Sequence, residues 1–164
     1  IASTSISMNI FNYSKPNLIS KKTKKTAKPY RYQYEELYLR IISFSERLDE
    51  YDGKLSKFLN DFMGDNKDAT PDKTEIWEVK LLKTLEISQK DSRLSKLSKS
   101  INEAILFGIY MNLDNPELES KEVLTNKINM LLEQPEFSLI SLKEGLASKE
   151  KVIGRLSKAI QIFK

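Results

Sequence analysis

The chain has 164 residues, of which 40% are hydrophobic, and this is enough apolar material for one domain with a core. It contains neither cysteine nor histidine, which excludes disulfides, thiolate nucleophiles, Cys/His zinc sites and imidazole acid–base catalysis. The net charge of +4 combines 27 basic with 23 acidic residues, and no apolar run approaches the roughly 18 residues of a membrane-spanning helix.

The charge is divided unevenly along the chain. Residues 1–34 contain seven basic residues and no acid, so the first carboxylate is Glu35. We therefore predict two parts, an extended basic N-terminal arm over residues 1–32 and a helical domain over residues 33–164. Within the arm, Pro16 and Pro29 prevent one continuous helix. Such a division of charge indicates that the two parts have different partners.

The arm carries the clearest functional signal of the sequence. Its lysines can neutralise phosphates and release counterions, which gives a sequence-independent affinity for polyanions. Neighbouring planar side chains can stack on unpaired bases. The alternatives are a solvated tail and a membrane surface, although the arm lacks a long amphipathic apolar face. The residues that we predict to bind nucleic acid are Lys15, Lys21, Lys22, Lys24, Lys25, Lys28, Tyr30, Arg31 and Tyr32.

The start of the chain also bears on its location. The first residue is Ile1 rather than methionine, so we expect a processed product, a cloning boundary or a fragment. An acid-poor, serine-rich start resembles an organellar transit peptide or the segment that follows one. This favours the mitochondrial matrix weakly, and the nucleus and cytoplasm remain alternatives.

A long helix is predicted over residues 33–62, because apolar residues recur there at alternating spacings of three and four. Gly53 interrupts it at a cost of about 1 kcal/mol. This stripe indicates the core helix of a bundle, with an intermolecular coiled coil as the alternative. Together with the single tryptophan, it supplies the residues that we predict to form a protein interface, namely Leu37, Ile41, Phe44, Leu48, Tyr51, Leu55, Phe58 and Trp77.

Two further helices are predicted before residue 112. The first runs over residues 71–87, with Thr70 as its N-cap and a proline in its first turn. The next covers residues 94–111, and its second half, residues 104–111, is apolar on all sides and therefore buried. The inner stripe that we predict for the first of these helices consists of Ile76, Val79, Leu82 and Leu85.

The last third of the sequence predicts two more helices. Asn115 and Pro116 give a cap-plus-proline signal for a helix that ends before Pro135. Ser141 and Glu144 match a capping box for the last helix, with a break expected near residues 147–148. The predicted fold class is therefore all-α, a bundle of about five helices whose first helix is long.

Residues 81–102 contain a leucine-rich stretch followed by three short pieces, Ile87-Ser88, Ser95-Lys96-Leu97-Ser98-Lys99 and Ile101-Asn102. This order resembles the N-terminal helical domain of transcription elongation factors, which integrase-binding-type chromatin adaptors share. The family pattern leads through Ile-Thr to Thr-Lys-Ile-Gly-Lys and Val-Asn. Here Ser98 replaces the family glycine, and the leucine pair after Ile-Thr is missing. The resemblance implies a five-helix module that binds short disordered peptides.

The sequence contains none of the usual signatures of catalysis. There is no GxGxxG, no Walker A, no GxSxG and no paired metal-ligand spacing. We therefore expect no enzyme, no cofactor and no metal, with a Mg²⁺-dependent carboxylate enzyme as a remote rival. The expected function is that of a structural subunit of a large ribonucleoprotein, ribosome-like and mitochondrial, whose body docks on other protein subunits while its arm binds RNA. The alternative is a peptide-binding or scaffold module.

Overall fold

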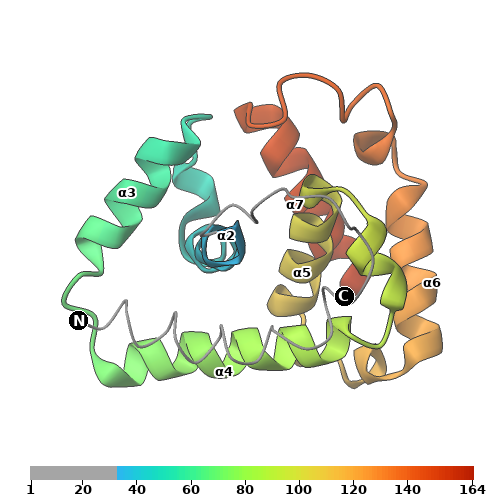
Figure 1. Ribbon diagram of the computed structural model, residues 1–164, viewed down its shortest axis with the longest axis horizontal. Coiled ribbons are helices and arrows are strands. Elements are labelled where there is room, and N and C mark those ends of the chain that lie inside the picture. The colour runs from blue at the N-terminus through green and yellow to red at the C-terminus, as the bar shows by residue number, and fades with distance from the viewer. Residues whose placement is uncertain (1–32) are drawn as a thin grey trace, which may run out of the picture.

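The computed structural model describes residues 33–164, and the predicted basic arm lies outside the described residues. The described part contains six α-helices joined by short turns and has no strand, which confirms the all-α bundle (Figure 1). The α-helices are α2 (Gln33–Arg47), α3 (Leu55–Asp65), α4 (Pro71–Ser88), α5 (Lys99–Met111), α6 (Lys121–Leu132) and α7 (Lys149–Phe163). The 3₁₀ turns are Leu48–Glu50, Ser92–Lys96, Pro116–Glu119 and Pro135–Phe137.

Helix α5 is the centre of the bundle, as its uniformly apolar second half predicts. It packs against α2, α4 and α7, and every residue from Ala104 to Tyr110 is buried. The contact with α7 is the closest, because a Cβ atom at Gly108 would lie 2.7 Å from the Phe163 ring. Figure 1 shows α5 between α2, α4 and α7, with α6 on the outer side of α7.

The single long helix predicted over residues 33–62 is wrong. Helix α2 ends at Arg47, a 3₁₀ turn follows, and α3 begins only at Leu55. Between them Gly53 adopts a φ of 93°, which a residue with a side chain rarely tolerates. The Tyr51 hydroxyl donates a hydrogen bond to the carbonyl oxygen of Ala147, so this corner is fixed against the segment before α7. Figure 1 shows α2 nearly end-on while α3 crosses the view.

The inner stripe predicted for α4 is wrong at two of its four positions, although Leu85 is buried as predicted and the helix itself lies where the sequence places it. Its Thr70 cap accepts a hydrogen bond from the Lys73 amide, as predicted. However, Ile76 and Val79 are 59% and 58% exposed, and Leu82 is half-buried. Besides Leu85, the residues that α4 buries lie beside the predicted stripe, and they are Trp77, Leu81, Thr84, Ile87 and Ser88.

The helix starts after residue 114 differ from the prediction as well. The Asn115–Pro116 signal opens a 3₁₀ turn, and α6 begins at Lys121 with Ser120 as its cap. Ser141 does not open a helix, because its hydroxyl donates to the carbonyl oxygen of Pro135 instead. Helix α7 begins at Lys149, which agrees with the break expected near residues 147–148. None of the helices in residues 33–164 has the length and apolar character that crossing a membrane requires.

Candidate functional site

The predicted nucleic-acid-binding residues all belong to the arm. They lie outside the described residues, so their role stays a prediction. The predicted protein-interface residues lie within residues 33–164 and can be placed. Six of them are buried inside this chain, Leu37, Ile41, Phe44, Tyr51, Phe58 and Trp77, while Leu48 and Leu55 are half-buried against the same core.

Three of these side chains form an aromatic cluster where α2, its corner and α3 meet. The ring centroids of Phe44 and Phe58 lie 5.2 Å apart in a stacked arrangement. The Tyr51 ring meets both edge-on, at 5.3 Å from Phe44 and 5.4 Å from Phe58. Such pairs stabilise a fold beyond the area that they bury. Their burial within one chain favours the bundle-core interpretation of the stripe over the intermolecular coiled coil.

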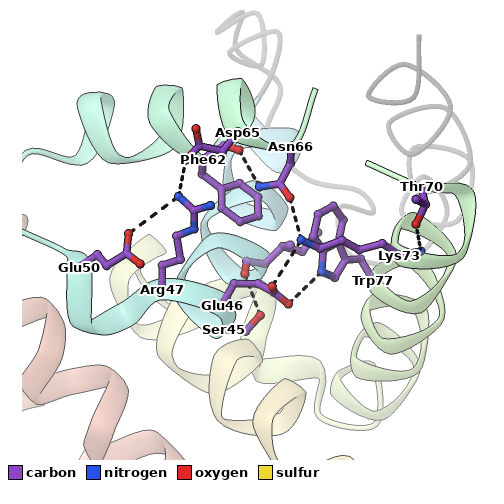
Figure 2. Close-up of polar contacts among 11 residues, drawn as sticks. Ser45, Glu46, Arg47, Glu50, Phe62, Asp65, Asn66, Thr70, Lys73 and Trp77 are labelled. Carbon is purple, nitrogen blue, oxygen red and sulfur yellow. Dashed lines mark hydrogen bonds and ion pairs between the residues drawn. The ribbon is translucent and has the colours of Figure 1, made fainter. Parts of the chain in front are cut away.

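A polar junction joins the end of α2 to the start of α4 (Figure 2). The Trp77 indole N–H donates to Glu46 at 3.2 Å, and the Lys73 ammonium lies 3.8 Å from the other carboxylate oxygen. Lys73 also donates to the Asn66 side chain at 2.8 Å and lies 4.9 Å from the centre of the Trp77 ring. Glu46 and Lys73 therefore hold Trp77 in place, and they also pair with each other.

A second ion pair ties the end of α2 to α3 in the same region. The Arg47 guanidinium lies 2.6 Å from Asp65 and 3.9 Å from Glu50, and it sits over the Phe62 ring (Figure 2). The hydrogen bond to Asp65 raises the pKa of Arg47 further above its ordinary value. These contacts position helices, and we assign them a structural role.

Two buried charged residues, Glu103 and Arg155, lie where α2, α5 and α7 approach one another, and the half-buried Arg40 lies beside Glu103. Glu103 lies 3.5 Å from the Arg40 guanidinium, which also pairs with Glu36 at 2.8 Å. Desolvation raises the pKa of Glu103, although Arg40 and Arg155 act to lower it. Desolvation likewise lowers the pKa of Arg155, whose guanidinium donates to the carbonyl oxygen of Leu146 at 2.8 Å. Sequence analysis missed this group, since its members are far apart in the chain.

Asp91 organises a separate polar cluster between the end of α4 and α6. Its carboxylate accepts from the Arg93 backbone and guanidinium and from the Thr125 hydroxyl, at 2.6–3.2 Å. Arg93 in turn donates to Asn129 of α6 at 2.8 Å. The hydrogen bonds from Arg93 are the main reason why the pKa of Asp91 lies below its ordinary value.

This cluster predicts a measurable dependence of stability on pH. Because the pKa of Asp91 is lower in the folded chain, its contribution is present above the unfolded pKa of about 3.9 and is lost as the pH falls below it. We expect Asp91→Asn to lower the free energy of unfolding by about 1 kcal/mol at pH 7. Urea unfolding at pH 7, 5 and 3.5 should show this difference shrinking in acid. Asp68→Asn, at an exposed loop position, is the control, and an equal loss at all three pH values would contradict the assignment.

Among residues 33–164, the most exposed large apolar side chains lie in the segment between the last 3₁₀ turn and α7. We call residues 138–148 the strap. Its Leu139 and Ile140 are 83% and 82% exposed. A second exposed apolar pair, Ile76 and Val79, lies on α4. Sequence analysis did not single out the strap pair, although two adjacent aliphatic residues within a serine-rich turn were a visible signal.

Residues 33–164 bring together no group of three or more acidic, histidine or cysteine side chains that could hold a metal ion. Searches against family models, curated proteins and solved structures gave no match for this chain, so the assignment of function rests on its own residues.

Proposed function

We propose that this chain is a non-catalytic structural subunit of a large assembly, and that a ribosome-like ribonucleoprotein of mitochondria is the assembly that fits it best. The helical body docks on neighbouring proteins, and the lysine-rich arm binds nucleic-acid phosphates. The observation that carries this proposal is the separation of charge. Seven basic residues and no acid precede Gln33, while residues 33–164 have a net charge of −3.

The body supports the docking half of the proposal. Its core is closed by side chains of the same chain, so a protein partner would meet the exposed apolar side chains instead. Leu139 and Ile140 at the strap are the largest such pair by exposure. A partner that packs on these two aliphatic side chains would remove their apolar surface from water, which favours association. The polar clusters at Glu46, Arg47 and Asp91 connect neighbouring helices of the body.

The arm proposal predicts a loss of salt-dependent RNA binding. Lys15, Lys21, Lys22, Lys24, Lys25 and Lys28 are all replaced with serine in the full chain, and binding to single-stranded RNA is measured between 50 and 300 mM salt. If all six contact phosphates, the slope of log K against log salt should flatten by about 4, since each contact with a single strand contributes about 0.7.

A matched variant separates the arm from total charge. It replaces the same number of exposed body lysines with serine, at Lys54, Lys57, Lys67, Lys96, Lys121 and Lys143. This variant should keep the affinity and the slope of the parent chain. An unchanged slope in the arm variant, or an equal loss in both variants, would remove the RNA role.

The peptide-binding or scaffold module remains the second candidate. The exposed apolar pairs at the strap and on α4 favour it, because they offer a protein two contact points that need no arm. On this alternative the arm variant and the parent chain bind RNA with the same affinity and salt slope. The same experiment therefore distinguishes the two functions.

A further inference from the structure

The strap is attached to the bundle in an unusual way. Phe137 before it and Val152 after it are buried, but no residue from 138 to 151 has a buried side chain. Hydrophobic burial, which holds the helices together, therefore contributes little to holding this segment. Its place in the structure depends on polar contacts.

Four of those polar contacts share one form, in which a side chain of the bundle donates to a carbonyl oxygen of the strap. A fifth runs the other way, because the Ser141 hydroxyl donates to the carbonyl oxygen of Pro135 before the strap. Lys151 of α7 donates to Ser141 at 3.1 Å and also to Glu144. Arg155 of α7 donates to Leu146 at 2.8 Å. The Tyr51 hydroxyl donates to Ala147 from the corner between α2 and α3. Three donor side chains thus hold the strap at four of its carbonyl oxygens, and water can replace each of these donors.

Two features allow the strap to move without disturbing the helices. Gly145 adopts a φ of 61°, which glycine reaches without strain, and nothing lies within 4 Å of where a Cβ would be, so no neighbour packs against the chain at this point. The second feature is the Nη1 atom of Arg155, which is buried but finds no acceptor among residues 33–164. Opening the strap would admit water to this guanidinium, which offsets part of the loss of its bond to Leu146.

We propose that residues 138–148 form a strap that opens as one unit while the helices stay folded, with the hydrogen bond from Tyr51 to Ala147 as its lock. Opening uncovers the Tyr51 hydroxyl and the guanidinium of Arg155. The lock also joins the strap to the corner at Gly53, where a Cβ atom would lie 3.4 Å from the Lys149 nitrogen. The device thus couples the strap to the packing of α2 and α3, and it is independent of any role of the arm.

Amide hydrogen exchange of the full chain tests this proposal. The amides of Leu142, Lys143 and Ser148 are hydrogen-bonded within the strap, to Ser138, Ile140 and Gly145, so their exchange reports its opening. In the parent chain they should exchange at least 10-fold faster than the amides of α5 and the middle of α7, relative to their unstructured rates. Equal protection in the strap and in these helices would overturn the proposal.

Two variants test the lock and the other attachment points. Tyr51→Phe keeps the ring in the aromatic cluster and should speed strap exchange about 5- to 10-fold, the usual effect of one hydrogen bond, while α5 is unchanged. Its control is Tyr110→Phe, which removes a core hydroxyl that bonds to Ser45 instead.

Lys151→Met should raise the exchange rate of the strap in the same way as Tyr51→Phe. Its control, Lys90→Met, removes a comparable bond to the Glu119 carbonyl. The proposal would be contradicted if the exchange rate rose equally in the strap and in the helices. It would also be contradicted if neither Tyr51→Phe nor Lys151→Met raised the exchange rate of the strap.

Discussion

Replacing Leu81 with alanine should lower the free energy of unfolding by about 3 kcal/mol, whereas Val79→Ala on the same helix should change it by less than about 0.5 kcal/mol. Leu81 is completely buried, so its removal leaves a cavity under α4. Val79 is 58% exposed and leaves none. Urea unfolding followed by circular dichroism measures both values, with similar m-values confirming that the same transition is compared.

The pair is informative because sequence analysis predicts the opposite order. The inner stripe that the sequence predicts for this helix contains Val79 and does not contain Leu81. If Val79→Ala were the more damaging variant, α4 would be rotated about its axis relative to the structure. Ile76→Ala provides an independent check, because Ile76 is exposed next to buried Trp77 and should behave like Val79.

The rotation of α4 shows what an apolar pattern leaves undetermined. Apolar residues surround this helix on several sides, and two of the positions that it buries are polar, Thr84 and Ser88. Their hydroxyls donate to backbone carbonyl oxygens within the helix, to Lys80 and Leu85, both at 2.8 Å. The polarity of these side chains is thereby satisfied without water. A pattern that counts only apolar residues therefore selects the wrong face.

The division of the first predicted helix has a different cause. Apolar residues at alternating spacings of three and four show which side chains share a helix face. This pattern does not show whether the helix is continuous or interrupted. Phe44 on α2 and Phe58 on α3 keep that spacing and still meet in one cluster, because the chain turns between them. The turn depends on Gly53 and on the bond from Tyr51 to Ala147, a residue 96 positions away. Of these two causes, only the glycine is visible in the local sequence. A glycine at position 53 is equally compatible with a kink in one continuous helix.

The candidate site was predictable to a smaller extent than the fold. The caps at Thr70 and the buried centre of α5 follow from local rules and are confirmed. The buried charges of Glu103 and Arg155 require contacts between α5 and α7 that no local pattern contains. The strap is similar, since its capping-box residue Ser141 donates to Pro135 rather than starting a helix. Local sequence rules thus predict the helices and their caps. The partners of the polar side chains depend on tertiary contacts, which these rules do not contain.

A methyl group at Gly108 should destabilise the fold even though alanine is the better helix former. Alanine in place of glycine favours a helix by about 1 kcal/mol. Against this, the added Cβ would lie 2.7 Å from the Phe163 ring and 3.1 Å from the carbonyl oxygen of Ala159. Both belong to α7, and Phe163 is fully buried, so neither can move away without separating α5 from α7. Overpacking costs about 1–3 kcal/mol, and a clash with two groups of a buried helix contact places Gly108→Ala at the upper end of that range. After the propensity gain of about 1 kcal/mol is subtracted, the variant should lose about 2 kcal/mol.

Gly64→Ala is the matched control, because Gly64 also lies within a helix, α3, and has nothing within 4 Å of the new methyl group. Without a clash the propensity term alone remains, so this variant should gain about 0.5–1 kcal/mol. The two substitutions are chemically identical and should differ in sign when their urea midpoints are compared with the parent chain. A Gly108→Ala variant as stable as Gly64→Ala would mean that α5 and α7 are not in close contact at this point. The α5–α7 contact is the tightest in the bundle, so the placement of α7, and of the strap that leads into it, depends on that outcome.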